Sequence, residues 1–180
     1  MARQPSNVAA LSRLMAFLSL CGFVLLPICV VYVFVAPDRS QWMMLDINHL
    51  GAEINSAVPI QLRLMALCCA LVPTGFTMWA LWSLQRLFRL YAKGSVFSAE
   101  ALAALNAVAI ALSAGVVAAF VAQAPISLAL TWYHGPHHRE ISLGFGSGDV
   151  ATLFTAGVVL VIARVMREAQ RVVDENAKFV

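Results

Sequence analysis

The sequence predicts an all-α, polytopic membrane protein with four transmembrane helices and both termini in the cytoplasm. Of its 180 residues, 61% are hydrophobic and only 12% are charged, whereas about a quarter of the residues in a soluble domain are charged. The apolar residues form four long blocks, and Lys and Arg gather in the segments on one side of those blocks. Together these observations favour a single integral membrane domain over residues 1–180.

The first predicted span covers residues 14–36 and contains no charge. At about 1.5 Å per residue it is long enough to cross a hydrocarbon core of about 30 Å. It is also longer than the apolar region of a signal peptide, and Phe34-Val35-Ala36 does not supply a small-x-small cleavage site. Pro27 lies in the middle of the span, where we expect a bend.

The second and third predicted spans, residues 64–84 and 102–124, are likewise uncharged. The fourth covers residues 150–166 and is the weakest. It can cross the membrane only if Arg164 extends its side chain toward the headgroups. We expect Asp149 to cap this helix by accepting hydrogen bonds from the free amides of its first turn.

The orientation follows from the distribution of Lys and Arg. Nine of the twelve lie on one side of the predicted spans: Arg3, Arg13, Arg86, Arg89, Lys93, Arg164, Arg167, Arg171 and Lys178. Because cytoplasmic segments carry the excess of basic residues, that side is predicted to hold both termini, the inner loop 85–101 and the tail 167–180. The outer loops are then residues 37–63 and 125–149.

The third span carries small residues every four positions, which allow another helix to approach closely. This stripe consists of Ala103, Ala107, Ala111, Gly115 and Ala119. We expect it to pack inside a four-helix bundle, and a homodimer seam is the alternative. Asn106, Ser113 and Gln123 are expected to form hydrogen bonds between helices.

The inner loop predicts a tight helical hairpin with one basic face. Arg86, Arg89 and Lys93 follow at spacings of three and four, so they share a side of the helix. Gly94 is expected to end this helix, and Ser98 to cap the next one. Anionic lipid headgroups are the simplest ligand for the basic face, and a protein partner is the alternative.

The C-terminal tail predicts an amphipathic helix on the cytoplasmic side. It carries Arg167 and Arg171, and Arg164 lies at pairing distance from Glu168. Two interpretations remain open: a solvated helix end packed on the inner hairpin, or a docking surface for a cytoplasmic protein.

The outer loops contain the four histidines of the chain: His49, His134, His137 and His138. Imidazole and carboxylate groups in one compartment are ordinary ligands of zinc, and histidine also titrates near neutral pH. The spacing matches no established metal motif, so we favour solvated loop histidines over a metal site.

Several classes of function are disfavoured. The predicted spans hold no Asp, Glu, Lys, Arg or His at mid-membrane depth, as a pump would require. No phosphate-binding loop, dinucleotide fingerprint or nucleophile elbow occurs, so we expect no enzyme and no cofactor. A scattered net charge of +3 does not favour direct binding of nucleic acid.

Two short stretches carry a family resemblance: Gly94-Ser95-Val96-Phe97-Ser98, and the last span leading through residues 162–166 into 174–180. The chain resembles the bacterial family catalogued as domain of unknown function 2975. It departs at Ala169, where we expect glycine, and at residues 177–179, where we expect a Leu-Thr ending. The resemblance implies a small inner-membrane protein without established activity, often encoded beside a small helix-turn-helix regulator. It carries over no catalytic residues.

The sequence therefore predicts a noncatalytic, multi-pass protein of the bacterial inner membrane, in contact with the lipid bilayer. Its basic hairpin and tail are expected to bind a cytoplasmic protein, for which the resemblance suggests a helix-turn-helix regulator. One alternative is an extracytoplasmic metal or pH sensor that uses the loop histidines. Another is an accessory subunit of a transporter or of a membrane enzyme complex.

Overall fold

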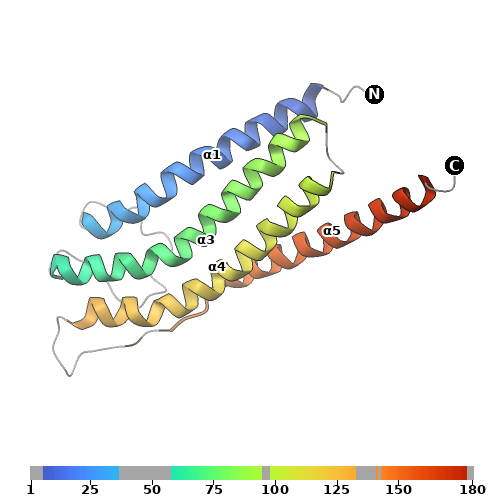
Figure 1. Cartoon of the computed structure of the whole chain (residues 1–180). Helices are drawn as coiled ribbons and strands as arrows, with labels where there is room; N and C mark the ends of the chain where they lie inside the picture. Colours follow the sequence, from blue (N-terminus) through green and yellow to red (C-terminus); the bar gives the residue numbers. More distant parts are fainter. Residues whose placement is uncertain (1–5, 37–57, 95–97, 133–140, 142, 178–180) are drawn as a thin grey trace.

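The described part of the chain forms four long α-helices (Figure 1). The computed structural model describes residues 6–36, 58–94, 98–132, 141 and 143–177. The helices are α1 (Ser6–Val35), α3 (Ile60–Ala92), α4 (Ala99–Thr131) and α5 (Ser147–Ala177), and the described residues include no strand. The all-α fold predicted from the sequence is therefore confirmed.

Each helix packs against its neighbour in the chain: α1 on α3, α3 on α4, and α4 on α5. The start of α1, the turn between α3 and α4, and the end of α5 lie at the same end of the molecule (Figure 1). We call this the charged end, because the exposed side chains of Arg86, Arg89, Lys93, Arg167 and Arg171 are found there. The arrangement is compatible with the predicted membrane four-helix bundle.

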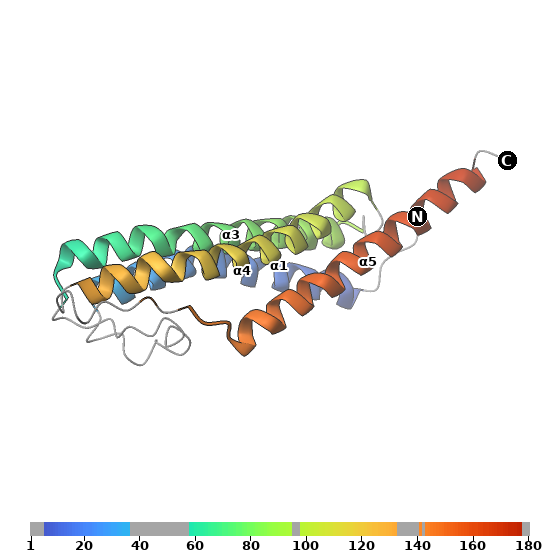
Figure 2. The same cartoon turned by 90° about the horizontal axis from the view of Figure 1, so that it is seen from below.

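The helix α5 is displaced along the bundle relative to the other three. It starts partway along α4, and its C-terminal part runs past the ends of α1, α3 and α4 (Figure 2). Residues beyond the bundle cannot be buried against it, and Arg167, Glu168 and Arg171 are exposed. These three side chains of the projecting part are therefore accessible.

The largest hydrophobic core lies at the opposite end, where α1 ends, α3 begins and α4 ends. Its buried residues are Val33, Phe34, Val58, Ala66, Leu67, Ala122, Ile126 and Leu130. A smaller core between α3 and α4 at the charged end holds Leu87, Ala101 and Ala104. Among the described residues, only those of α1, α3 and α4 and the adjoining Val58 contribute to these two cores.

The helix α4 continues through Pro125 to Thr131, although the predicted span ends at residue 124. Proline lacks an N–H and normally interrupts a helix at a cost of about 3 kcal/mol. Here Ile126 and Leu130, which are 3% and 2% exposed, are buried in the main core just beyond it. Burial of these two side chains favours continuation of the helix, and this is information that local sequence does not contain.

The predicted turn at the charged end is confirmed. Gly94 has a φ of 85°, a left-handed conformation that glycine adopts easily, and it follows the last turn of α3. The Ser98 hydroxyl accepts a hydrogen bond from the backbone N–H of Ala101 at 3.2 Å, which caps α4.

The cap of α5 differs from the prediction in detail. The helix begins at Ser147, so Asp149 lies inside its first turn. Its carboxylate Oδ2 accepts from the backbone N–H of Gly146 at 2.9 Å. This is the contact that a third-position acid makes in a capping box, reaching back to the residue before the helix.

The small-residue stripe on α4 does not face a single neighbour. An α-helix turns about 100° per residue, so positions four apart drift by about 40° at each step. Accordingly Ala103 is exposed, Ala111 is fully buried, and Gly115 faces Phe76 of α3. Ala107 and Ala119, between and beyond them, are half-buried. The stripe therefore winds around α4 as it runs along the helix.

Candidate functional site

The charged end is the candidate site because it combines accessible cations with two helix ends. Arg86, Arg89 and Lys93 lie at the end of α3 and are exposed. Arg167 and Arg171 lie on the projecting part of α5 and are also exposed. All five cations predicted to bind a lipid or a partner are therefore accessible in the described structure.

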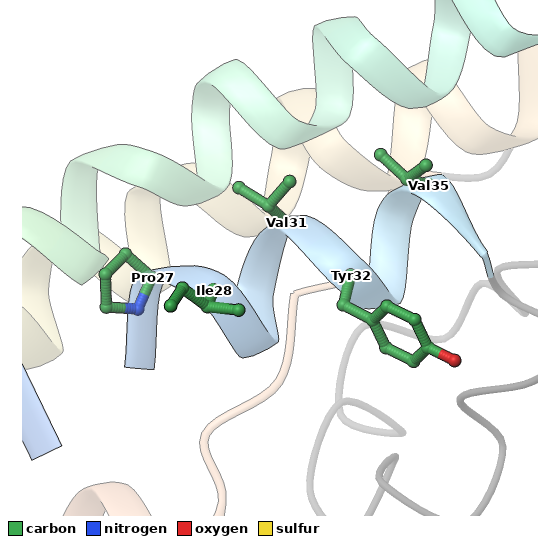
Figure 3. A pocket seen from close by; sticks show the side chains of 5 residues that line it. All are labelled: Pro27, Ile28, Val31, Tyr32 and Val35. Carbon is green, nitrogen blue, oxygen red and sulfur yellow. The ribbon is translucent and has the colours of Figure 1, made fainter. Parts of the chain in front are cut away.

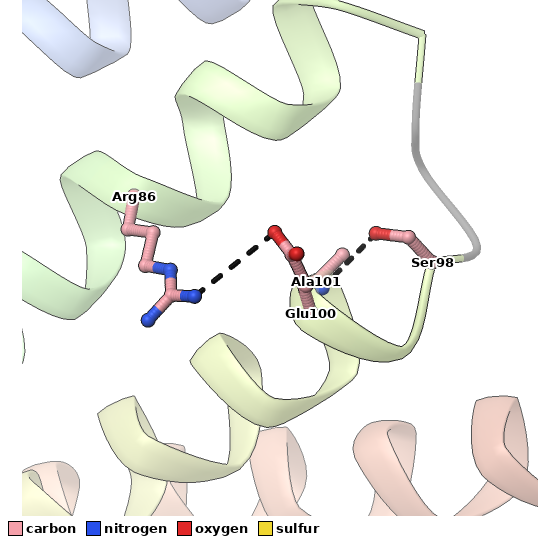
Figure 4. A network of polar contacts seen from close by, with 4 residues as sticks. All are labelled: Arg86, Ser98, Glu100 and Ala101. Atoms are coloured by element: carbon pink, nitrogen blue, oxygen red, sulfur yellow. Dashed lines mark hydrogen bonds and ion pairs between the residues drawn. The ribbon is translucent and has the colours of Figure 1, made fainter.

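One of these cations pairs across the hairpin. Arg86 Nη2 lies 4.0 Å from Glu100 Oε2, with the two side chains 63% and 66% exposed (Figure 4). A pair this long and this exposed is worth at most about 1 kcal/mol. This pair is not predicted from the sequence, because the two residues come together only once the tight turn has placed the start of α4 beside α3.

A second exposed pair lies on the projecting part of α5. Arg171 Nη1 is 4.0 Å from Glu168 Oε1, three residues earlier. We had expected Glu168 to pair with Arg164, and that prediction is wrong, because the acid turns toward Arg171. Arg164 and Arg167 are exposed beside this pair.

The start of α5 is held against α4 by the segment before it. Gln123 is 6% exposed, and its Oε1 accepts from the backbone N–H of Gly144 at 2.7 Å. In the same segment the Phe145 ring packs on Phe120 with centroids 6.0 Å apart. The bond of Gln123 was predicted between helices, but its partner is the connection that leads into α5.

The remaining contact between α4 and α5 is narrow. Among the described side chains of α5, only Ala156 and Ala163 are buried, at 0% and 1% exposure. They lie seven residues apart on one face of the helix, as a close-packed seam between two helices requires. Thus α5 is fixed firmly near its start and by small residues further along.

Two other polar residues of α4, Ser113 and Asn106, were also predicted to form hydrogen bonds between helices. Ser113 Oγ donates to the backbone carbonyl of Ala109 at 3.0 Å, within α4 itself. The interhelical prediction for Ser113 is therefore wrong, because its hydroxyl finds a nearer acceptor one turn back in its own helix. Asn106 is half-buried, and its role stays a prediction.

The opposite end holds an apolar groove of about 430 Å³ along α1 (Figure 3). It is lined by Pro27, Ile28, Val31, Tyr32 and Val35. At the end of this helix Arg63 Nη1 donates to the backbone carbonyl of Val35 at 3.4 Å. This is a favourable place for a cation, because the carbonyls at a helix C-terminus carry partial negative charge.

The predicted metal candidates His49, His134, His137 and His138 lie outside the described residues. Within the part of the chain that the structure describes, no three His, Cys, Asp or Glu residues are grouped as a metal site would require. The accessible chemistry of the charged end is that of guanidinium and ammonium groups, which bind phosphates and carboxylates.

All four helices are long and apolar enough to cross a membrane, over Ala10–Val35, Ile60–Ala92, Ala99–Thr131 and Ser147–Arg171. The fold and its exposed apolar surface are those of a multi-pass helical membrane protein.

More particularly, the chain belongs to the family described as protein of unknown function (DUF2975), whose model matches residues 3–180. The match covers essentially the whole chain and confirms the resemblance seen in the sequence. Comparison with curated proteins and with solved structures gave no match.

Proposed function

We propose that this protein is a noncatalytic regulatory or accessory component of the bacterial inner membrane. Its charged end faces the cytoplasm, and the projecting part of α5, with the basic hairpin beside it, binds a cytoplasmic protein. The observation that carries the proposal is the displacement of α5, whose C-terminal part runs past the ends of the other helices (Figure 2). Arg167 and Arg171 in this part of α5 are exposed.

The charge distribution supports this orientation. The nine cations assigned to the inner side include every Lys and Arg of the hairpin and tail, against three on the other side. Basic residues near the ends of spans favour the cytoplasmic face. The family resemblance adds a candidate partner, a small helix-turn-helix regulator held at the membrane.

The orientation can be tested by cysteine labelling. In a variant with Cys21, Cys29, Cys68 and Cys69 replaced by Ser, Lys93→Cys should react with a membrane-impermeant maleimide in inside-out vesicles. It should stay unlabelled in intact cells. Labelling from the outside of intact cells would contradict the proposed orientation.

Partner binding can be tested by copurification from solubilised membranes. We expect truncation after Met166 to release a cytoplasmic protein that the full chain retains. Truncation after Ala177, which keeps Arg167 and Arg171, serves as the matched control. Equal recovery with and without residues 167–180 would remove the tail from the proposal.

A further inference from the structure

The exposed side of α3 carries two tryptophans, followed by three basic residues toward the end of the helix. Trp79 and Trp82 are 41% and 62% exposed, although indole rings are usually buried in helical bundles. They are followed on the same side by the three cations of the hairpin. We call this set, Trp79, Trp82, Arg86, Arg89 and Lys93, the Trp–cation face.

The five residues share one side because their spacings are three, four, three and four. At about 100° per residue they occupy an arc of roughly 80°. Residues that pack on other helices point elsewhere: Leu87 lies in the small core with α4, and Leu81 contacts Gly22 of α1. Apart from the exposed pair of Arg86 with Glu100, the Trp–cation face is therefore not covered by the described helices.

The order of residues matches the layers of a bilayer leaflet. Tryptophan concentrates at the boundary between hydrocarbon and headgroups, whereas Lys and Arg lie just outside it. At about 1.5 Å per residue, Arg86 and Arg89 lie roughly 6 and 10 Å beyond Trp82 along the axis. The headgroup layer on each side of a bilayer is about 5–7 Å thick, so Arg86 lies at headgroup depth. The backbones of Arg89 and Lys93 lie beyond that layer, and their long side chains can extend back to the phosphates.

We propose that the Trp–cation face is a binding site for an anionic phospholipid of the cytoplasmic leaflet. Arg89 and Lys93, which form no ion pair among the described residues, contact the phosphate or the charged headgroup. Trp79 and Trp82 contact the upper part of the acyl chains. The assignment of the leaflet rests on the proposed orientation, but the preference for anionic lipid does not.

An acidic neighbour tunes this site. Glu100 lies 4.0 Å from Arg86 and competes with a phosphate for that guanidinium. Without this carboxylate, the Arg86 guanidinium is available to bind a lipid phosphate. Glu100→Gln should therefore strengthen anionic lipid binding, whereas loss of cations should weaken it. A change in fold alone would not give opposite effects of this kind.

Tryptophan fluorescence provides the readout. In a Trp42→Phe/Trp132→Phe background only Trp79 and Trp82 emit, and lipids with brominated acyl chains quench an indole that they touch. The full chain is reconstituted in vesicles that contain brominated phosphatidylglycerol or, at equal mole fraction, brominated phosphatidylcholine. We expect the anionic lipid to quench more strongly.

Two double variants test whether the cations of the Trp–cation face cause the preference for anionic lipid. One cation near an anionic leaflet corresponds to roughly a five-fold preference, so Arg89→Gln/Lys93→Gln should reduce the selectivity ten-fold or more. Arg167→Gln/Arg171→Gln on the projecting part of α5 removes the same charge and should leave the selectivity unchanged. Equal quenching by the two lipids in the parent, or equal loss in the two double variants, would overturn the proposal. Partner recovery is measured separately, so failure of one proposal does not decide the other.

Discussion

Substitution of Gly115 tests how closely α3 and α4 approach each other. A Cβ added at Gly115 would lie 3.4 Å from the Cβ of Phe76, which is at the near limit of ordinary van der Waals contact. Alanine in a helix interior is more favourable than glycine by about 0.5–1 kcal/mol. Gly115→Ala should therefore be neutral or stabilising, by up to about 1 kcal/mol.

A larger side chain at position 115 should lower the stability of the protein. Gly115→Leu extends beyond the Cβ toward Phe76 and should cost about 1–3 kcal/mol through overpacking. A change of 1 kcal/mol shifts the melting temperature of a chain of this length by roughly 2–4 °C. Gly157→Ala, at a site with nothing within 4 Å of the added Cβ, is the matched control for helix propensity alone.

The assay is thermal unfolding of the purified chain in detergent, followed by circular dichroism. We expect the melting temperature to rise slightly for Gly115→Ala and Gly157→Ala, and to fall for Gly115→Leu. Light scattering should give the same oligomeric state for all three variants. A large destabilisation by Gly115→Ala alone would refute the packing argument, and dissociation of an oligomer by that variant would place the stripe between copies.

Three further predictions concern single contacts. The first two are measured by thermal unfolding against the unmodified chain, and the third by a spin-label distance. Gln123→Leu removes the acceptor of the Gly144 N–H and should cost about 1–3 kcal/mol, because that amide is then left without its partner; an unchanged melting temperature would mean that water replaces the side chain. Ser98→Ala removes the cap on the Ala101 amide and should cost about 1 kcal/mol, whereas Ser98→Asp, which retains an acceptor, should not. Ala163→Leu inserts bulk at a side chain that is 1% exposed and should loosen α5 from α4; a spin-label distance between the two helices that does not widen would contradict the narrow seam.

Local signals allowed much of the charged end to be predicted. Gly94 and Ser98 specify a helix end and a helix start through backbone conformation and a single hydroxyl, and both act within a few residues. The spacing of Arg86, Arg89 and Lys93 likewise fixes that they share one side, because helical geometry depends only on sequence separation.

Partners across helices were not predictable in the same way. Ser113 was expected to bond to another helix but bonds within its own, and Glu100 approaches Arg86 from a different helix. In both cases the choice depends on which acceptor or donor lies nearest in space. Sequence separation alone does not supply that distance.

The sequence by itself determined that the chain forms four apolar helices with basic residues concentrated on one side, because hydrophobic length and charge are properties of composition along the chain. Only the tertiary structure decided that α4 continues past Pro125, that the small-residue stripe winds around α4, and that α5 is displaced so that its charged part projects. These features depend on burial and close approach between helices, and those interactions exist only when the helices are packed together.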